Sequence, residues 1–225
     1  MSSLFDLDAP IWVFMGEVAD VIILALLWWI GCLGIITMGA STTALYYVLG
    51  KKVRKETTYV AKDFFKSFRQ NFRQSIPLSI LTMIGWMSFI LYCSFVIEGI
   101  FFPDQSSSLK WTLPITILFG FELFNITAYL WALLSRFDMH SGSLLRSALI
   151  MTHKHLITTF MNLGVIMLTV FCIIKFPFAI VIAPSVIVWG QSFMIQKIFS
   201  TYIEKSDKKQ TTESIRAFSS EVGIE

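Results

Sequence analysis

Five long apolar stretches, separated by short basic segments, leave few folds open to this chain. They lie at about residues 18–38, 76–101, 111–134, 156–174 and 178–199. Each is close to the roughly 20 residues that a helix needs to cross about 30 Å of hydrocarbon. Of the 225 residues, 55% are hydrophobic and only 15% are charged, against roughly 25% charged in a soluble domain. The sequence therefore predicts an all-α, polytopic membrane helix bundle of about five transmembrane helices.

The basic residues predict the sidedness of this bundle. Eight of them gather between the first two apolar stretches: Lys51, Lys52, Arg54, Lys55, Lys62, Lys66, Arg69 and Arg73. By the positive-inside rule this segment is cytoplasmic, which puts the amino terminus outside and the carboxy terminus inside. Glu17 and Asp20 are then expected at the outer entry of the first span. We expect residues 1–203 to form a single transmembrane domain and residues 204–225 a polar, partly disordered cytoplasmic tail.

One cytoplasmic segment, residues 57–73, has the pattern of an amphipathic helix. Phe64, Phe68 and Phe72 recur at helical spacing, with Phe65 beside them. A second stripe at the same spacing is basic: Lys62, Lys66, Arg69 and Arg73. Such a helix can lie on the inner leaflet with its rings at the acyl boundary, or it can dock on a cytoplasmic partner.

Small residues mark the end of the first span and the segment that follows. Gly31, Gly34 and Gly39 form a thin face that another helix can approach closely, either from a partner or within this chain. The segment after Gly39 predicts a second short helix, with Ser41 or Thr42 as its N-cap and Thr43 next to them. We take these six residues as a candidate partner interface.

Glu122 and Asn125 are the candidate functional residues inside a span, because both lie near the middle of the third apolar stretch and on one helix face. A carboxylate at that depth must face protein or water, or be protonated. Two interpretations remain open. Either the pair faces a polar path, or a neutral Glu122 is hydrogen-bonded to a neighbouring helix, for example to Asn162. We expect His153 and His155, which come before the fourth span, to be polar surface residues.

Familiar catalytic and cofactor-binding signatures are missing from the sequence. It contains no Walker A motif, no Gly-rich dinucleotide loop, no HExxH, no CxxC and no GxSxG. Cys32, Cys93 and Cys172 each fall within an apolar run, which indicates buried thiols rather than a disulfide framework or a zinc site. We therefore expect a nonenzymatic protein with no cofactor and no metal. The basic, phenylalanine-containing segment lies between two spans, and this position favours contact with the membrane or with a protein over contact with nucleic acid.

Three motifs resemble the YesL-like family of bacterial integral membrane proteins. The first is a threonine and a glycine followed by ASTTALYYV, at Thr37 and residues 39–48; the second is the aromatic and basic stretch at residues 63–72; the third is RFD at residues 136–138. The resemblance extends from about residue 10 to 202. Two departures are Ala25, where an asparagine is expected, and the missing proline before RFD.

The resemblance implies a multi-pass protein of the bacterial cell membrane with no characterised biochemical activity. Members of the family are associated with loci that encode carbohydrate ABC importers. It therefore implies an accessory or regulatory subunit that contacts the lipid bilayer, the permease subunits and possibly the ATPase. The alternative from the residues themselves is a small stand-alone transporter or channel with Glu122 and Asn125 on its polar path.

Overall fold

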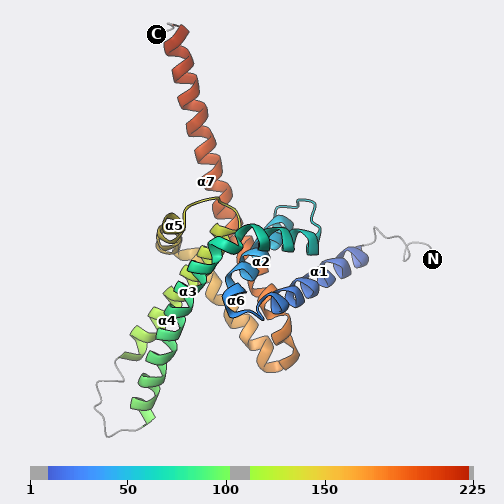
Figure 1. Ribbon diagram of the computed structural model, residues 1–225, viewed down its shortest axis with the longest axis vertical. Coiled ribbons are helices and arrows are strands. Elements are labelled where there is room, and N and C mark those ends of the chain that lie inside the picture. The colour runs from blue at the N-terminus through green and yellow to red at the C-terminus, as the bar shows by residue number, and fades with distance from the viewer. Residues whose placement is uncertain (1–9, 102–111, 223–225) are drawn as a thin grey trace, which may run out of the picture.

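The computed structural model describes residues 10–101 and 112–222, and within them all regular elements are helices. This confirms the all-α prediction. The α-helices are α1 (Pro10–Gly31), α2 (Met38–Val53), α3 (Val60–Phe101), α4 (Leu113–Leu134), α5 (Ser141–Lys154), α6 (Leu156–Lys175) and α7 (Ala183–Val222), joined in two places by the 3-10 helices η1 (Ile35–Thr37) and η3 (Pro177–Val181). Figure 1 shows their arrangement.

Helix α2 is the centre of the bundle. It contacts α1, α3, α4 and α7, and its buried residues cover every side of the helix. The predicted short helix is thus confirmed, but the predicted cap is wrong, because the helix begins at Met38 and Thr37 is its N-cap. Thr42 and Thr43 lie inside the helix and donate to the carbonyl oxygens of Met38 and Gly39, each at 2.8 Å. Hydroxyls satisfied within their own helix are tolerated in an apolar interior.

Four of the described helices contain stretches long and apolar enough to cross a membrane: Phe14–Gly31, Val60–Glu98, Leu113–Leu134 and Leu156–Lys175. Large apolar side chains lie exposed along all four, for example Leu26, Ile84, Leu118 and Met167. Exposed apolar surface of this extent suits hydrocarbon rather than water. These helices therefore indicate an integral membrane protein.

The fifth predicted span, residues 178–199, is not among these four. Residues 177–181 form η3, and Pro184 is the second residue of α7, so it begins this helix instead of kinking a continuous span. The polar residues of α7 explain its low hydropathy: Gln191, Ser192 and Gln196 are buried by neighbouring helices. A helix covered by protein does not need an apolar surface all round.

Helix α7 also includes most of the predicted tail. It continues without interruption to Val222, and Figure 1 shows its C-terminal half projecting away from the other helices. The expectation of partial disorder is therefore wrong for residues 204–222, which are helical. The last three residues of the predicted tail lie outside the described residues.

The contacts of α1 bear on the predicted sidedness. Lys52, at the end of α2, lies 2.5 Å from Asp20 and 2.8 Å from Glu17, both in the first half of α1. At the C-terminal end of α1, Trp29 donates to the carbonyl oxygen of Val181 in η3 at 3.0 Å. Helices α1 and α2 thus run antiparallel, which places the first half of α1 beside the basic segment. This arrangement disagrees with the prediction that the amino terminus and the basic segment lie on opposite sides of the membrane.

Candidate functional site

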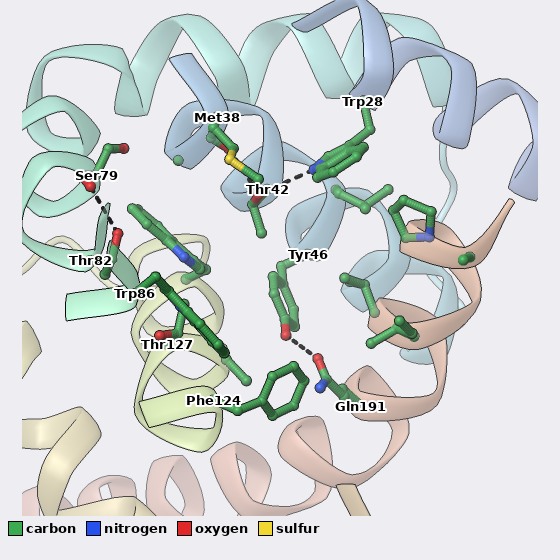
Figure 2. Close-up of a pocket in the computed structure, with 18 of the residues that line it drawn as sticks. Trp28, Met38, Thr42, Tyr46, Ser79, Thr82, Trp86, Phe124, Thr127 and Gln191 are labelled. Atoms are coloured by element: carbon green, nitrogen blue, oxygen red, sulfur yellow. Dashed lines mark hydrogen bonds between the residues drawn. The ribbon is translucent and has the colours of Figure 1, made fainter. Parts of the chain in front are cut away.

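A cavity of about 510 Å³ lies among α1, α2, α3, α4, η3 and α7. This volume is within the range of roughly 300–1,000 Å³ that is usual for small-molecule sites. Figure 2 shows side chains from these elements converging on it. The central helix α2 contributes Met38, Gly39, Thr42, Leu45 and Tyr46 to its wall.

The cavity wall is mainly apolar. It includes four tryptophans, one tyrosine and one phenylalanine: Trp28, Trp29, Trp86, Trp131, Tyr46 and Phe124. None of the described residues that line the cavity carries a charge. Such a wall favours an uncharged ligand with a large apolar surface.

A few polar groups interrupt this apolar wall. The Tyr46 hydroxyl donates to Gln191 Oε1, and Trp28 Nε1 donates to Thr42 Oγ1 at 3.1 Å, as the dashed lines in Figure 2 show. Two further polar atoms have no hydrogen-bond partner: Gln191 Nε2 and Ser79 Oγ. The exposed fractions of these residues are 1% and 2%. Buried polar groups are normally paired, so each of these atoms requires an explanation.

The predicted glycine face is filled by this chain's own side chains. A Cβ on Gly31 would lie 2.0 Å from Ser41 Oγ, and a Cβ on Gly39 would lie 2.0 Å from Ser79 Oγ. Gly34 lies in the turn before η1, against Thr37. Gly39 is therefore buried by packing within the chain, whereas Gly31 is half-buried and Gly34 is exposed.

The phenylalanine stripe of residues 57–73 also faces inward. Phe64 is buried in the core, its ring stacks on Phe68 at 6.4 Å between centroids, and Phe68 lies 5.7 Å from Phe72. The expectation that these rings lie at the acyl boundary is thus wrong for Phe64, because the bundle itself covers it. Phe65 remains exposed.

The opposite side of this segment is a cationic face, made of Lys62, Lys66, Arg69 and Arg73, all exposed. Asp63 fixes the start of α3 beneath it, since its carboxylate accepts from Tyr59 N at 3.1 Å and from Lys51 Nζ at 2.8 Å. The hydrogen bond to Asp63 raises the pKa of Lys51. The cationic face therefore lies on a helix whose start is fixed by the contacts of Asp63 on its buried side.

Comparison with protein families shows that the cationic face and part of the cavity wall lie in one matched segment of the chain. Residues 21–96 match the family described as Protein of unknown function, DUF624. This DUF624 segment contains the second half of α1, all of α2 and most of α3, and with them the cationic face and the cavity residues Trp28, Gly39, Tyr46 and Ser79. No curated protein and no solved structure matches the chain.

Glu122 and Asn125 lie outside the DUF624 segment and do not line the cavity. Asn125 is buried, and its Oδ1 accepts from Asn162 Nδ2 at 3.1 Å. Asn162 therefore pairs with Asn125 and not, as the sequence analysis considered, with Glu122. Glu122 instead lies 3.8 Å from His153 Nε2, and the exposed fractions of these two side chains are 26% and 64%. The two candidate residues thus have different surroundings.

Sequence analysis missed a polar cluster that links the DUF624 segment to the rest of the chain. Arg54 Nη1 donates to Gln196 Oε1 at 2.9 Å, and Arg136 of the RFD motif donates to the same oxygen. Glu56 pairs with Arg54 at 2.5 Å. Burial, together with the nearby Arg54, lowers the pKa of Arg136. The cluster joins the ends of α2 and α4 to the first half of α7. No local pattern signals a contact across this many residues.

Potential metal ligands are dispersed in the structure. Among residues 10–101 and 112–222, no three His, Cys, Asp or Glu side chains come together as a metal site.

Proposed function

We propose that this protein is a nonenzymatic accessory or regulatory subunit in the bacterial cell membrane, associated with a carbohydrate ABC importer. The resemblance to the YesL-like family supports the choice of partner. The match of residues 21–96 is to a family without a described function, so it adds no argument about the partner.

The cationic face of α3 is the observation that carries the proposal. Because Phe64 is buried and Phe68 and Phe72 are half-buried, the four basic side chains project from a helix with a fixed orientation. A cluster of cations on a fixed helix suits an acidic surface of a permease or its ATPase, because little backbone entropy remains to be lost on binding. Within the thin glycine face, Gly39 plays no part in this docking, since it is buried against Ser79 and Trp131.

The test is affinity purification in a mild detergent from cells that are importing sugar. We expect permease or ATPase subunits to co-purify with the natural protein and to be lost from the double variant Lys66→Glu/Arg69→Glu. Lys208→Glu is the matched control, because Lys208 is an exposed lysine on α7, far along the chain from this face. The proposal is wrong if no importer subunit co-purifies, or if the double variant and the control retain the same partners.

A second candidate function, a small stand-alone transporter or channel, is favoured by the central cavity and not by Glu122 and Asn125. If it is correct, purified protein in vesicles transports a solute, Gln191→Met changes the flux, and Glu122→Gln leaves it unchanged because Glu122 does not line the cavity. Absence of flux from the purified protein would exclude this candidate.

A further inference from the structure

The wall of the central cavity offers almost no polar group to a ligand. Four of its hydroxyl groups donate to acceptors within the protein: those of Thr42, Tyr46, Thr82 and Thr127. The unpaired atoms Gln191 Nε2 and Ser79 Oγ have almost no accessible surface, so they cannot bond a molecule in the cavity. A ligand rich in polar groups would lose its hydrogen bonds to water here without replacement, which is costly.

The mouth of the cavity lies on apolar surface that belongs to membrane-spanning helices. Four residues both line the cavity and are exposed: Trp29 on α1, Met38 on α2, Met83 on α3 and Ile180 in η3. Helices α1 and α3 are long and apolar enough to cross a membrane, so their exposed side chains contact hydrocarbon. The medium at the mouth therefore consists of the acyl chains of lipids.

The cavity lies toward one leaflet of the membrane. Along α2 its wall extends from Met38 to Tyr46, which is roughly 12 Å at the helical rise of 1.5 Å per residue. Half of a hydrocarbon core is about 15 Å thick. The basic residues of α2 lie at the other end of the helix, at Lys51 and Lys52. Because the positive-inside rule makes that end cytoplasmic, the cavity faces the outer leaflet.

The volume of the cavity suits a hydrocarbon chain. An apolar cavity of about 150 Å³ holds one benzene molecule, so on this scale 510 Å³ corresponds to about 20 carbon atoms. A chain inside the cavity gives the lining atoms dispersion contacts over its whole length. A lipid headgroup stays outside the mouth, because its charge has no partner among the described lining residues.

We propose that the cavity is a binding site for an acyl chain of an outer-leaflet phospholipid. The wall is apolar, the mouth opens into hydrocarbon, and the depth and volume match a chain. A sugar fits poorly, because its many hydroxyls would meet no free polar group in this wall. This inference is independent of the docking proposed for the cationic face of α3.

The experiment is photolabelling of the full chain in dioleoylphosphatidylglycerol vesicles that contain a phosphatidylglycerol with a diazirine midway along one acyl chain. Mass spectrometry locates the label, and three tyrosines provide a matched readout. Tyr46 projects among the lining side chains and is otherwise buried (Figure 2). Tyr129 is buried but does not line the cavity, and Tyr92 is exposed on α3.

We expect label at Tyr46 and Tyr92 and none at Tyr129. The double variant Ala128→Phe/Val188→Phe narrows the cavity from α4 and α7, so it should lose most of the label at Tyr46 and keep the label at Tyr92. The control is Val170→Phe/Val186→Phe, which adds two rings at exposed positions outside the cavity and should keep both labels. If the first variant fails to fold, the three tyrosines of the natural protein still decide the question.

Three results would overturn the proposal. The first is label at Tyr92 without label at Tyr46, because acyl chains would then reach the protein but not the cavity. The second is equal labelling of Tyr46 and Tyr129, which would indicate a general opening of the bundle. The third is unchanged labelling of Tyr46 in a folded Ala128→Phe/Val188→Phe protein.

Discussion

Replacing Gly39 by alanine tests whether the glycine face serves internal packing. The new Cβ would lie 2.0 Å from Ser79 Oγ, and 2.4 and 2.9 Å from Cη2 and Cζ3 of the Trp131 ring. The hydroxyl can rotate away, but the ring is buried between helices. Gly164 in α6 provides a matched control, because a Cβ there meets no atom within 4 Å.

Both substitutions replace glycine by alanine within a helix, which is favourable, but only Gly39→Ala also introduces overpacking. Alanine is favoured over glycine within a helix by up to about 1 kcal/mol, so Gly164→Ala should leave the protein equally stable or slightly more stable. At Gly39 the same gain is opposed by overpacking, which costs about 1–3 kcal/mol. The difference between the variants is therefore about 1–3 kcal/mol, or about 2–12 °C in melting temperature for a chain of this length.

Melting of both purified variants in one detergent, followed by circular dichroism, gives this difference directly. If Gly39→Ala is as stable as Gly164→Ala, the packing argument is wrong. If Gly39→Ala is equally stable and also loses co-purifying subunits, the glycine face is a partner interface after all.

Three further predictions concern the amide pair, the protonation of one histidine and the sidedness. Asn162→Leu leaves Asn125 without its donor, so the free energy of unfolding should fall by about 1–3 kcal/mol; thermal melting should show that leucine at both positions recovers most of this loss. Burial, with a contribution from the neighbouring lysine, lowers the pKa of His155, so the unfolded chain binds the extra proton, and the melting temperature should fall as the pH drops through about 6.5. His155→Asn should reduce that fall, whereas an equal reduction in His153→Asn would contradict the assignment. In a chain without its natural cysteines, single cysteines at the amino terminus and at Thr57 should react with an impermeant maleimide from the same side of the membrane, and labelling from opposite sides would refute the antiparallel arrangement of α1 and α2.

The amphipathic segment of α3 shows what the helical spacing of residues in a sequence can and cannot predict. The spacing of Phe64, Phe68 and Phe72 correctly predicted a helix with one aromatic and one basic face, because side chains three or four residues apart share a face. Periodicity does not identify what covers a face. The expectation that lipid covers the rings failed for Phe64, because the core of this chain covers it.

Helix α7 shows the converse limit. Its buried Gln191, Ser192 and Gln196 lower the hydropathy of the segment, although it packs among the other helices. Hydropathy indicates whether an isolated helix would be more stable in water or in hydrocarbon. Here neighbouring helices surround the segment instead. The fifth expected span is therefore a 3-10 helix followed by a partly polar, protein-covered helix.

Length, apolar content and spacing by themselves determined that this chain is helical and suited to a membrane. These properties are local, because each helix satisfies its own backbone and requires only enough apolar residues to span the hydrocarbon. Tertiary structure alone decided that Gly39 admits Ser79 and Trp131, and that Tyr46 meets Gln191 across 145 residues of sequence. Such contacts depend on how helices cross and rotate against each other, and only the packing of the whole bundle determines those angles.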